Sequence, residues 1–535
     1  MAIGKRCSEL PTPRSRCLDR HDPLPLPRSP WISSVLGQLP HPAVWVAPPM
    51  VVVFPWLAFG HMIPFLELSK RLARRGHAVT FVTTPGNAAK LLGAAAAPPH
   101  LRVATLALPE VDGLPGGAEA TADVPPEKVG LLKKAFDGLA APFADLVAES
   151  CAGDGDGDAG FSRKPDFIIH DFAHNWLWPI AEEHQISCAV YLIMPAALLA
   201  FFGSKEKNEA HPRSTVEDYM VPPPWIDFPT TISHRRHEAK AIAAAFRPND
   251  AGVSDIDRFW EMQERPSCRL ILQRSCPELE PRVFPLLTDM FAMPFVASGL
   301  LLPDEVAAVD EDDDKVDVVR WLDKQPRRSV VYVALGSEAP VMASHVRELA
   351  VGLELSGARF LWALRRPAGE DAGDVLPDGF EARVAGRGVV ATGWVPQVRV
   401  LGHGAVGAFV THCGWGSTVE SLFRFGLPLV MLPFVANQGL IARAMAARGV
   451  GVEVPREDDD EGMFRGEDVA AAVRKVMEEE EGREMARKAM ELKEVLGDRG
   501  KQEQYVDELA NQPEQRRTDI EQHQLITTEH QHHIS

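Results

Sequence analysis

The chain has 535 residues, a length that suggests three or four domains but also fits two large α/β domains. Its composition, 45% hydrophobic and 24% charged, is typical of a soluble enzyme, and a net charge of −18 argues against nucleic acid or an anionic membrane as the main partner. The seven cysteines lack CxxC spacing, and the longest apolar run, at 188–203, is too short to span a bilayer. We therefore expect a cytoplasmic protein with free thiols and no membrane span.

The two ends of the chain differ in composition from the rest. Residues 1–49 contain six basic and three acidic residues and many prolines, and they lack the apolar segment of a secretory signal. An organelle targeting peptide is the alternative, but the acids and prolines argue against it. We expect a disordered extension at 1–49 and a disordered tail, rich in Gln, Glu and His, at 512–535.

From residue 50 onward, strand and helix patterns alternate. Apolar runs predict strands at 50–56, 77–83, 101–108, 166–170, 189–194 and 269–274, with a helical stretch at 129–150. After the first strand, the tetrapeptide AFGH at 58–61 predicts a turn. The helix that follows is expected to run to Arg75, with Pro64 in its first turn and Gly76 as its stop. Such alternation is typical of a doubly wound parallel sheet.

A second series of strands follows an acidic, proline-containing stretch at 295–315. It comprises apolar runs at 330–334, 360–364, 389–392, 408–411, 429–432 and 450–454. We therefore predict an α/β protein with two Rossmann-like domains that face each other across a cleft. The N-terminal domain is placed at 50–297, a linker at 298–328 and the C-terminal domain at 329–511, with the last helix expected to pack back on the N-terminal domain.

Three motifs that suggest other ligands fail in context. The G-x-G-x-x-G match at 402–407 precedes a strand instead of opening a helix, so it is no dinucleotide fingerprint. Asp154, Asp156 and Asp158 begin like a calcium loop, but its glycine and its final glutamate are missing. His234 and His237 have no nearby carboxylate or cysteine at metal spacing. We expect no metal site.

A glycine turn at 412–416 follows the apolar run at 405–411. The sequence His-Cys-Gly-Trp-Gly lets the backbone approach a ligand closely, and Ser417 with Glu420 predicts a capping box that opens a helix. A helix start favours anions, so the turn is a candidate phosphate site to which His412 adds a donor. The alternative is an ordinary βα turn with a satisfied histidine, which the fragment alone favours.

The segments on either side of this turn favour the phosphate site over the ordinary βα turn. WVPQ at 394–397 follows one apolar run, and Asn437-Gln438 follows another. Polar groups at the carboxyl ends of several parallel strands converge on one crevice. The sequence therefore predicts a ligand site built from these three segments.

The stretch from Trp394 to Gln438 resembles the signature box of plant family 1 UDP-sugar glycosyltransferases, in its WVPQ and HCGW motifs and in Ser417, Glu420 and Gln438. The resemblance extends from about residue 50 to about residue 509, and PWLAFGHMIPFLELSKRLA resembles the branch that adds a sugar to an existing glycoside. It implies the GT-B fold and an inverting, metal-independent transfer of a hexose from a UDP-sugar. It also implies a flavonoid, a terpenoid or one of their glycosides as the acceptor in secondary metabolism. The implied enzyme is a monomer with no cofactor besides the donor.

The resemblance also implies roles for donor-binding residues, in three groups. The uridine contacts are Trp394 on uracil, Val395 and Gln397 on the base and ribose side, and Glu420 on the ribose hydroxyls. The diphosphate contacts are Ser337, His412, Ser417 and the backbone of Gly414 and Gly416. The residues facing the donor sugar are Trp415, Asn437 and Gln438.

His61 and Asp171 are the candidate catalytic pair. Each lies at the carboxyl end of a predicted strand, and histidine is suited to general-base chemistry near neutral pH, with a carboxylate behind it to fix its tautomer. From the residues alone, a helix histidine and a helix-capping aspartate remain the simpler interpretation. The resemblance implies the catalytic roles. It gives no role to His170 and His174, which we place near the acceptor at most.

Three departures from the family pattern stand out. Gly416 occupies a position that is usually Asn, Asn437 one that is usually acidic, and one extra residue lies between Glu420 and Gly426. Gly416 and Asn437 motivate one alternative, a UDP-sugar-binding protein with weak catalysis. A sugar-nucleotide epimerase is a further alternative that rests on analogy of fold alone.

Overall fold

The computed structural model describes residues 49–92, 97–152, 163–248, 252–302, 313–336, 339–365, 375–393, 395–435, 437–457, 459 and 462–510, with only the backbone at 313–316. The predicted terminal extensions, the loop with Asp154, Asp156 and Asp158, and the predicted site residues Ser337 and Trp394 lie outside these ranges.

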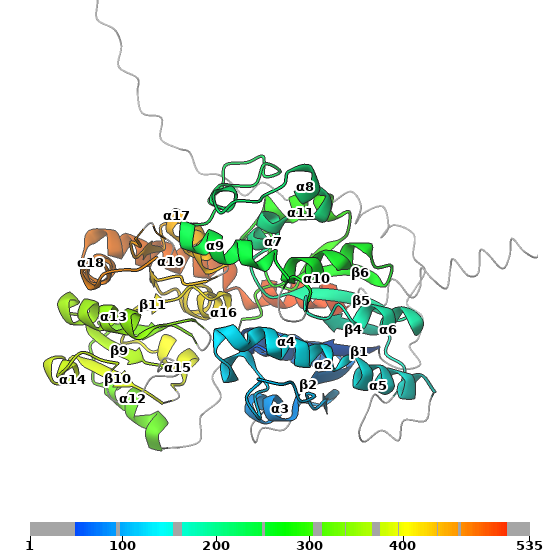
Figure 1. The fold of residues 1–535 in the computed structure, drawn as a ribbon. Helices are drawn as coiled ribbons and strands as arrows, with labels where there is room; N and C mark the ends of the chain where they lie inside the picture. The colour runs from blue at the N-terminus through cyan, green and yellow to red at the C-terminus, as the bar shows by residue number, and fades with distance from the viewer. Residues whose placement is uncertain are drawn as a thin grey trace, which may run out of the picture. The chain divides into compact units, whose positions relative to one another are not determined.

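The first sheet is a seven-stranded parallel sheet (Figure 1). Its order is β3-β2-β1-β4-β5-β6-β7, with bounds β1 Met50–Phe54, β2 Ala78–Thr83, β3 Leu101–Thr105, β4 Phe167–His170, β5 Ser187–Leu192, β6 Cys268–Gln273 and β7 Phe295–Ala297. The order in which successive strands join the sheet reverses between β1 and β4. These two strands pair from Val51 with Phe167 to Phe54 with His170. This reversal creates the switch point where ligands bind in such sheets.

The second sheet repeats the same order in six parallel strands. It runs β10-β9-β8-β11-β12-β13, with bounds β8 Val330–Ala334, β9 Arg359–Ala363, β10 Gly388–Ala391, β11 Val406–Thr411, β12 Leu429–Met431 and β13 Gly451–Glu453. Its switch point lies between β8 and β11, where Thr411 pairs with Ala334. The predicted α/β architecture of two doubly wound parallel sheets is confirmed.

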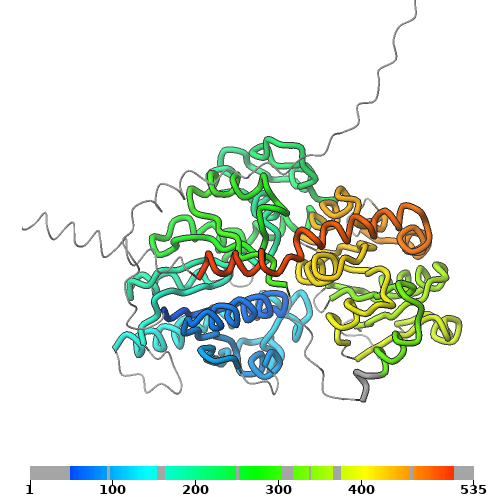
Figure 2. Tube along the Cα trace, turned by 180° about the vertical axis from the view of Figure 1, so that it is seen from behind, coloured from blue at the N-terminus to red at the C-terminus, as the bar shows by residue number. Residues whose placement is uncertain are grey.

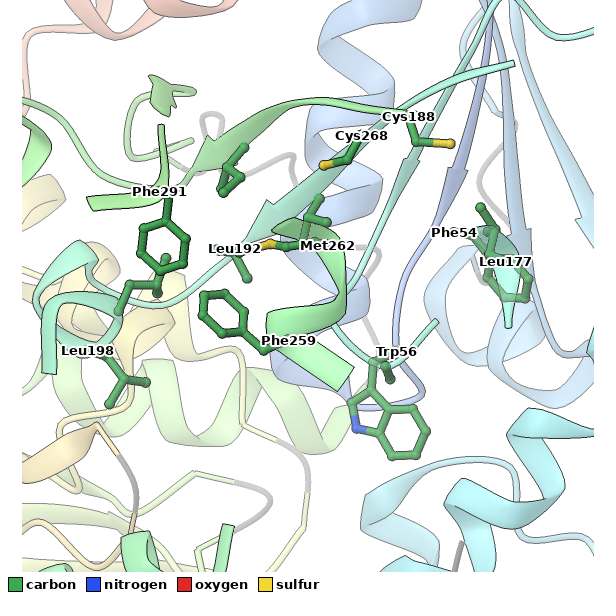
Figure 3. Packing of buried hydrophobic residues seen from close by; sticks show 14 of the residues in the cluster. Phe54, Trp56, Leu177, Cys188, Leu192, Leu198, Phe259, Met262, Cys268 and Phe291 are labelled. Carbon is green, nitrogen blue, oxygen red and sulfur yellow. The ribbon is translucent and has the colours of Figure 1, made fainter. Parts of the chain in front are cut away.

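Both sheets are buried on both faces. In β1, Val52 and Phe54 join one apolar cluster, while Val51 and Val53 join another, so successive side chains pack against opposite layers. Figure 3 shows part of the first cluster, with Phe54 labelled. A strand that is buried on both faces does not need polar residues at alternate positions. Continuous apolar runs such as MVVVF therefore marked the strands in the sequence.

Helices connect the strands and cover the sheets (Figure 1). Around the first sheet they are α2 Phe59–Arg74, α3 Pro85–Leu92, α4 Val129–Asp137, α5 Ala140–Ala152, α6 Leu177–Glu183, α7 Ala196–Phe202, α8 Lys205–Ala210, α9 Arg236–Ala245, α10 Asp255–Glu261 and α11 Val283–Phe291. In the second series they are α12 Asp313–Asp323, α13 Ala343–Ser356, α14 Phe380–Arg383, α15 Gln397–Leu401, α16 Trp415–Thr418, α17 Gln438–Ala447, α18 Gly466–Met477 and α19 Glu480–Leu496.

Two element predictions were wrong. The helix after β1 begins at Phe59, so Gly60 and His61 lie in its first turn instead of in a preceding turn, and Pro64 is its sixth residue. The glycine suggested a turn, but Ala58 already ends the extended segment, with φ −122° and ψ 136°. The strand β7 lies in the stretch interpreted as a domain boundary. It has only three residues, two of them half-buried, so it is too short to stand out as a strand of its own.

The extra residue between Glu420 and Gly426 is accommodated inside a helix. Residues Val419–Arg424, which continue α16, form a π-helical segment, and Gly426 follows with φ +70°. A π-helical turn takes one residue more than an α-helical turn, so an inserted residue widens the helix locally. The widening begins just before Glu420 and leaves the glycine turn in front of it undisturbed.

The C-terminal helical segment at 499–510 lies against the first sheet's helix α2. Arg71 Nη1 pairs with Glu503 Oε1 at 2.6 Å, and Arg75 Nε pairs with Asp507 Oδ1 at 2.6 Å. Figure 2 shows this last, red segment beside the blue helix. Among the helices within the described ranges, none is long and apolar enough to cross a membrane.

Candidate functional site

His61 and Asp171 meet at the carboxyl edge of the first sheet. His61 is the third residue of α2, directly after β1, and Asp171 directly follows β4. Because β1 and β4 are adjacent parallel strands, their following residues share one edge, and His61 Nδ1 lies 2.7 Å from Asp171 Oδ2. The carboxylate is 1% exposed and the imidazole 16%, so the pair is held from behind while the ring remains accessible.

The Asp171 carboxylate is fixed by backbone donors. Its Oδ2 also accepts a hydrogen bond from the Trp56 amide at 3.1 Å, and its Oδ1 accepts one from the Phe172 amide at 2.8 Å. A carboxylate can only accept, so the His61 proton sits on Nδ1 and the lone pair sits on Nε2. This is the tautomer that a general base of the Ser-His-Asp type uses.

His170 and His174 bracket the same aspartate from the core. Their Nδ1 atoms donate to the Asp171 carbonyl at 2.9 and 3.1 Å, and both rings are buried beside aromatic residues such as Phe136 and Trp178. Burial lowers the pKa of His170 to about 4 and that of His174 well below its usual value, so both are neutral near pH 7. Both side chains lie inside the core, with 1% and 0% of their surface exposed, and their place relative to the acceptor stays a prediction.

The second sheet carries the glycine turn at the equivalent switch point. The His412 ring lies between two glycines: a Cβ on Gly336 would come within 2.6 Å of its Cε1, and one on Gly414 within 2.3 Å of its Nε2. Gly336 has φ +75°, and Cys413 takes φ +63° within the turn. Burial, followed by the nearby Arg365 charge, lowers the His412 pKa to about 4, so the ring is a neutral donor or acceptor.

The helix after the turn starts earlier than predicted. Gly414 is the N-cap of α16, and the Thr418 amide donates to its carbonyl at 2.9 Å, so the capping box from Ser417 to Glu420 is wrong. Gly414 has no side chain to cap with, so the amides of the first turn keep no side-chain acceptor from their N-cap. Ser417 and Gly416 lie in this first turn, where an anion would meet backbone donors.

Glu420 contacts Gln397, the first residue of α15. Gln397 Nε2 donates to Glu420 Oε2 at 2.7 Å, which joins α15 to the π-helical segment. Burial raises the pKa of Glu420, and the Gln397 hydrogen bond partly offsets this. Val395, half-buried, precedes the same short helix. The uridine-side residues that the structure describes therefore lie together.

The segment that starts α17 holds the two remaining donor-side residues. Asn437 is the N-cap of that helix, and its side chain makes no capping hydrogen bond. Gln438 Oε1 accepts hydrogen bonds from the Phe434 and Val435 amides at 2.8 and 3.0 Å. Its carbonyl end is thus occupied by the chain, which leaves its amide nitrogen as the group available for a sugar hydroxyl.

Trp415 joins the two sheets. Its indole nitrogen donates to the Arg274 carbonyl at 2.8 Å, at the carboxyl end of β6, and the ring is buried. Sequence reasoning did not single out Arg274, nor Arg365, which follows β9 and whose charge acts on His412. A usable signal existed, because both arginines follow the carboxyl ends of parallel strands, as His61, Asp171 and His412 do.

A cavity of about 550 Å³ lies at the carboxyl side of β5 and β6. Its walls include Phe228 and Leu279 from loops of the first sheet, Val283 at the start of α11, Trp415, and the face of α17 with Leu440 and Ala444. The lining is mainly apolar. Neither His61 nor Asp171 lines it, whereas Trp415, which is predicted to face the donor sugar, does.

The histidines dismissed as metal ligands occupy a charged contact. One detail of that prediction was wrong: the Glu238 carboxylate lies 3.6 Å from His234 Nδ1, but it pairs with Arg443 Nη2 at 2.7 Å. Over the residues that the structure describes, His, Cys, Asp and Glu form no group of three that could hold a metal.

Comparison with known proteins identifies the family. A family model described as UDP-glucoronosyl and UDP-glucosyl transferase matches residues 290–502. UDP-glycosyltransferase 91B1 of Arabidopsis thaliana is 41% identical over 464 residues, which cover 85% of this chain and 95% of that protein. The chain belongs to the plant family 1 UDP-glycosyltransferases.

Other relatives and solved structures agree with this membership. The soyasaponin III rhamnosyltransferase of Glycine max is 36% identical over a region that covers 85% of this chain and 93% of that protein. A UDP-glucosyltransferase from Polygonum tinctorium capable of glucosylating indoxyl superposes with a TM-score of 0.68 at 26% identity, covering 87% and 99% of the two chains. Os79 from O. sativa, solved with UDP, has a TM-score of 0.67 at 25% identity and covers 86% and 100%. The protein is therefore a GT-B enzyme that transfers a sugar from a UDP-sugar.

Proposed function

We propose that this glycosyltransferase moves a hexose to a hydroxyl group of a small hydrophobic acceptor, with His61 as general base and Asp171 as its supporting carboxylate. The observation that carries the proposal is the 2.7 Å contact between His61 Nδ1 and Asp171 Oδ2 at the switch point of the first sheet. The three hydrogen bonds to the Asp171 carboxylate hold it oriented toward the ring.

In the proposed reaction, His61 Nε2 takes the acceptor's hydroxyl proton as the oxygen attacks the anomeric carbon. The bond from that carbon to the diphosphate oxygen breaks with its electron pair going to UDP, and the anomeric configuration inverts. Asp171 stabilises the imidazolium that forms. The charge that develops on UDP is met by the glycine turn, the first-turn amides of α16, His412 and Ser417. On this basis we propose that neither a metal nor a further cofactor is needed.

The acceptor proposal rests on the relatives and on the surroundings of the pair. The printed names of two relatives, soyasaponin III rhamnosyltransferase and beta-D-glucosyl crocetin beta-1,6-glucosyltransferase, describe enzymes of the kind that extend large apolar glycosides. Beside His61, the Phe172 ring lies 5.9 Å away between centroids and offers an apolar surface. We propose a terpenoid or flavonoid glycoside as the acceptor and the cytoplasm as the compartment.

The test is an acceptor panel with UDP-glucose, UDP-galactose and UDP-rhamnose for the wild type and His61→Ala. We expect His61→Ala to lose about 10²–10⁴-fold in kcat, the usual contribution of a general base, while the Kd for UDP stays within twofold. Activity unaffected by EDTA is expected from the proposed metal independence. Near-normal turnover of His61→Ala would remove it from the mechanism. Tight UDP binding without turnover on any pair would instead favour the alternative of a weakly catalytic UDP-sugar-binding protein.

A further inference from the structure

Arg274 is a buried arginine held rigidly at the boundary between the two sheets. It directly follows β6 and is 6% exposed. Its amide donates to the Leu192 carbonyl at 2.8 Å, its Nε donates to the Leu300 carbonyl at 3.0 Å, and its carbonyl accepts the Trp415 indole hydrogen bond at 2.8 Å. The backbone and the neck of the guanidinium are therefore fixed, and only its outer nitrogens remain to bind something.

One of those outer nitrogens, Nη1, lies toward the glycine turn. Within the described residues, Nη1 and Nη2 of Arg274 have no hydrogen-bond partner, and no carboxylate pairs with them, yet neither atom is sealed from solvent. Among the described residues outside its own helical turn, a Cβ placed on Gly416 would come within 4 Å of Arg274 Nη1 alone, at 3.9 Å. The absent side chain at 416 thus opens a space between the guanidinium and the first turn of α16.

The charges around Arg274 leave it a net cation. Burial lowers its pKa, but an arginine starts so high that it stays protonated at neutral pH. The groups that act on it from neighbouring elements are Tyr191, Glu420, Arg71 and Glu67. Of these, Glu420 is turned to Gln397 and Glu67 to Arg71 Nε, at 2.7 and 2.9 Å. A buried, unpaired cation is costly unless an anion completes it.

We propose that Arg274 binds the diphosphate of the UDP-sugar, reaching through the space at Gly416 to the ligand on the glycine turn. The planar guanidinium offers two parallel donors to phosphate oxygens, and its fixed neck means that little side-chain entropy is lost on binding. In this arrangement the first sheet contributes a charge to a site otherwise built by the second. The inference goes beyond the proposed function: it depends on UDP binding and not on His61 as the base.

Isothermal titration with uridine, UMP, UDP and UDP-glucose tests the proposal in the full-length protein. Arg274→Gln should weaken UDP by about 10- to 100-fold, the loss of one or two charge-assisted hydrogen bonds, and leave uridine unchanged. Arg274→Lys, which keeps the charge, should fall in between. Arg448→Gln is the matched control, because Arg448 Nη2 also donates to a carbonyl across the same boundary, that of Leu279 at 2.6 Å, without facing the turn.

Three outcomes would overturn the proposal. They are unchanged UDP affinity in Arg274→Gln, an equal loss for uridine and UDP, which would indicate a merely structural role, and a loss confined to UDP-glucose, which would place the guanidinium on the sugar. Failure of His61→Ala to slow transfer would leave this result untouched, so the two proposals are tested separately.

A second variant keeps Arg274 in place and guards against misfolding of Arg274→Gln. Gly416→Asp puts a carboxylate beside Nη1, where it would pair with the guanidinium and occupy the space for the diphosphate. We expect UDP affinity to fall at least tenfold with uridine binding retained, and the effects of Arg274→Gln and Gly416→Asp to be strongly non-additive in the double variant. Unchanged UDP binding in Gly416→Asp, or full additivity, would contradict a shared ligand.

Discussion

The two switch points of this molecule share a topology and differ in chemistry. At β1 and β4 the sheet presents side chains: His61 and Asp171 are 2.7 Å apart, and the carboxylate is held by backbone amides. At β8 and β11 it presents backbone and space, because Gly336 and Gly414 enclose His412, which burial keeps neutral and which pairs with no carboxylate among the residues that the structure describes. What stands beside a histidine at the end of a parallel strand sets the chemistry it is suited to, and we propose a base for His61 and a neutral phosphate ligand for His412.

The sharpest way to break this comparison is to remove the carboxylate from the first switch point. Asp171→Asn deprives His61 of the partner that fixes its tautomer, and we expect kcat to fall about 10²–10⁴-fold with UDP binding unchanged. Steady-state kinetics and titration with UDP measure both effects. Asp166→Asn is the matched control, since Asp166 Oδ2 accepts the Met50 amide at 2.8 Å from the opposite end of β4. Equal kinetics in the two variants would refute the pair.

The glycine turn at the second switch point should be sensitive to added side-chain volume rather than to the loss of a charge. Gly414→Ala would push a Cβ to 2.3 Å from His412 Nε2, so the ring or the turn has to move. Overpacking of this kind costs about 1–3 kcal/mol, and we expect UDP affinity to fall roughly tenfold or more. Gly404→Ala serves as the control, because, besides its chain neighbours, no residue in the described part of the chain lies within 4 Å of its Cβ position. Should Gly414→Ala bind UDP as well as Gly404→Ala, the turn would not need its close approach.

The neutral state of His412 at the second switch point can be tested by changing the pH. The pKa of folded His412 is about 4 against an ordinary 6.5, so the unfolded chain binds more protons between these values and stability falls as pH drops through that window. From pH 7 to pH 5, His412 alone should remove about 2 kcal/mol of unfolding free energy. Urea unfolding of wild type and His412→Gln at both pH values measures this, and the variant should lose less. Identical losses would mean that His412 is not held neutral.

The smallest expected effect lies beside the donor sugar. Asn437 caps α17 without a side-chain hydrogen bond, so a carboxylate there could accept charge-assisted bonds from sugar hydroxyls. We expect Asn437→Asp to raise kcat/KM for UDP-glucose several-fold while the Kd for UDP hardly changes. A competition assay between UDP-glucose, UDP-galactose and UDP-rhamnose decides the meaning. If another donor gains more, or UDP-glucose loses, Asn437 selects the sugar and is not a weakened glucose contact.

Sequence alone determined the sheets, because strands buried on both faces must be apolar throughout. Apolar runs such as those of β1 and β8 can therefore be recognised in the sequence. It also singled out the glycine turn, and the family resemblance marked His61 and Asp171. Helix starts escaped it: the starts at Phe59 and Trp415 have alanine and glycine as N-caps, and neither has a capping side chain.

Only the tertiary structure decided which distant residues complete each site. Asp171 reaches His61 because β1 and β4 are neighbours in the sheet, and Nη1 of Arg274 lies toward Gly416 because β6 ends where the other sheet's glycine turn begins. The local sequence does not reveal either contact, since a charged residue at a strand end marks a candidate position but does not name its partner. The partner is set by strand order and by the packing of one sheet's edge against the other, which place a carboxylate beside His61 and glycines around His412.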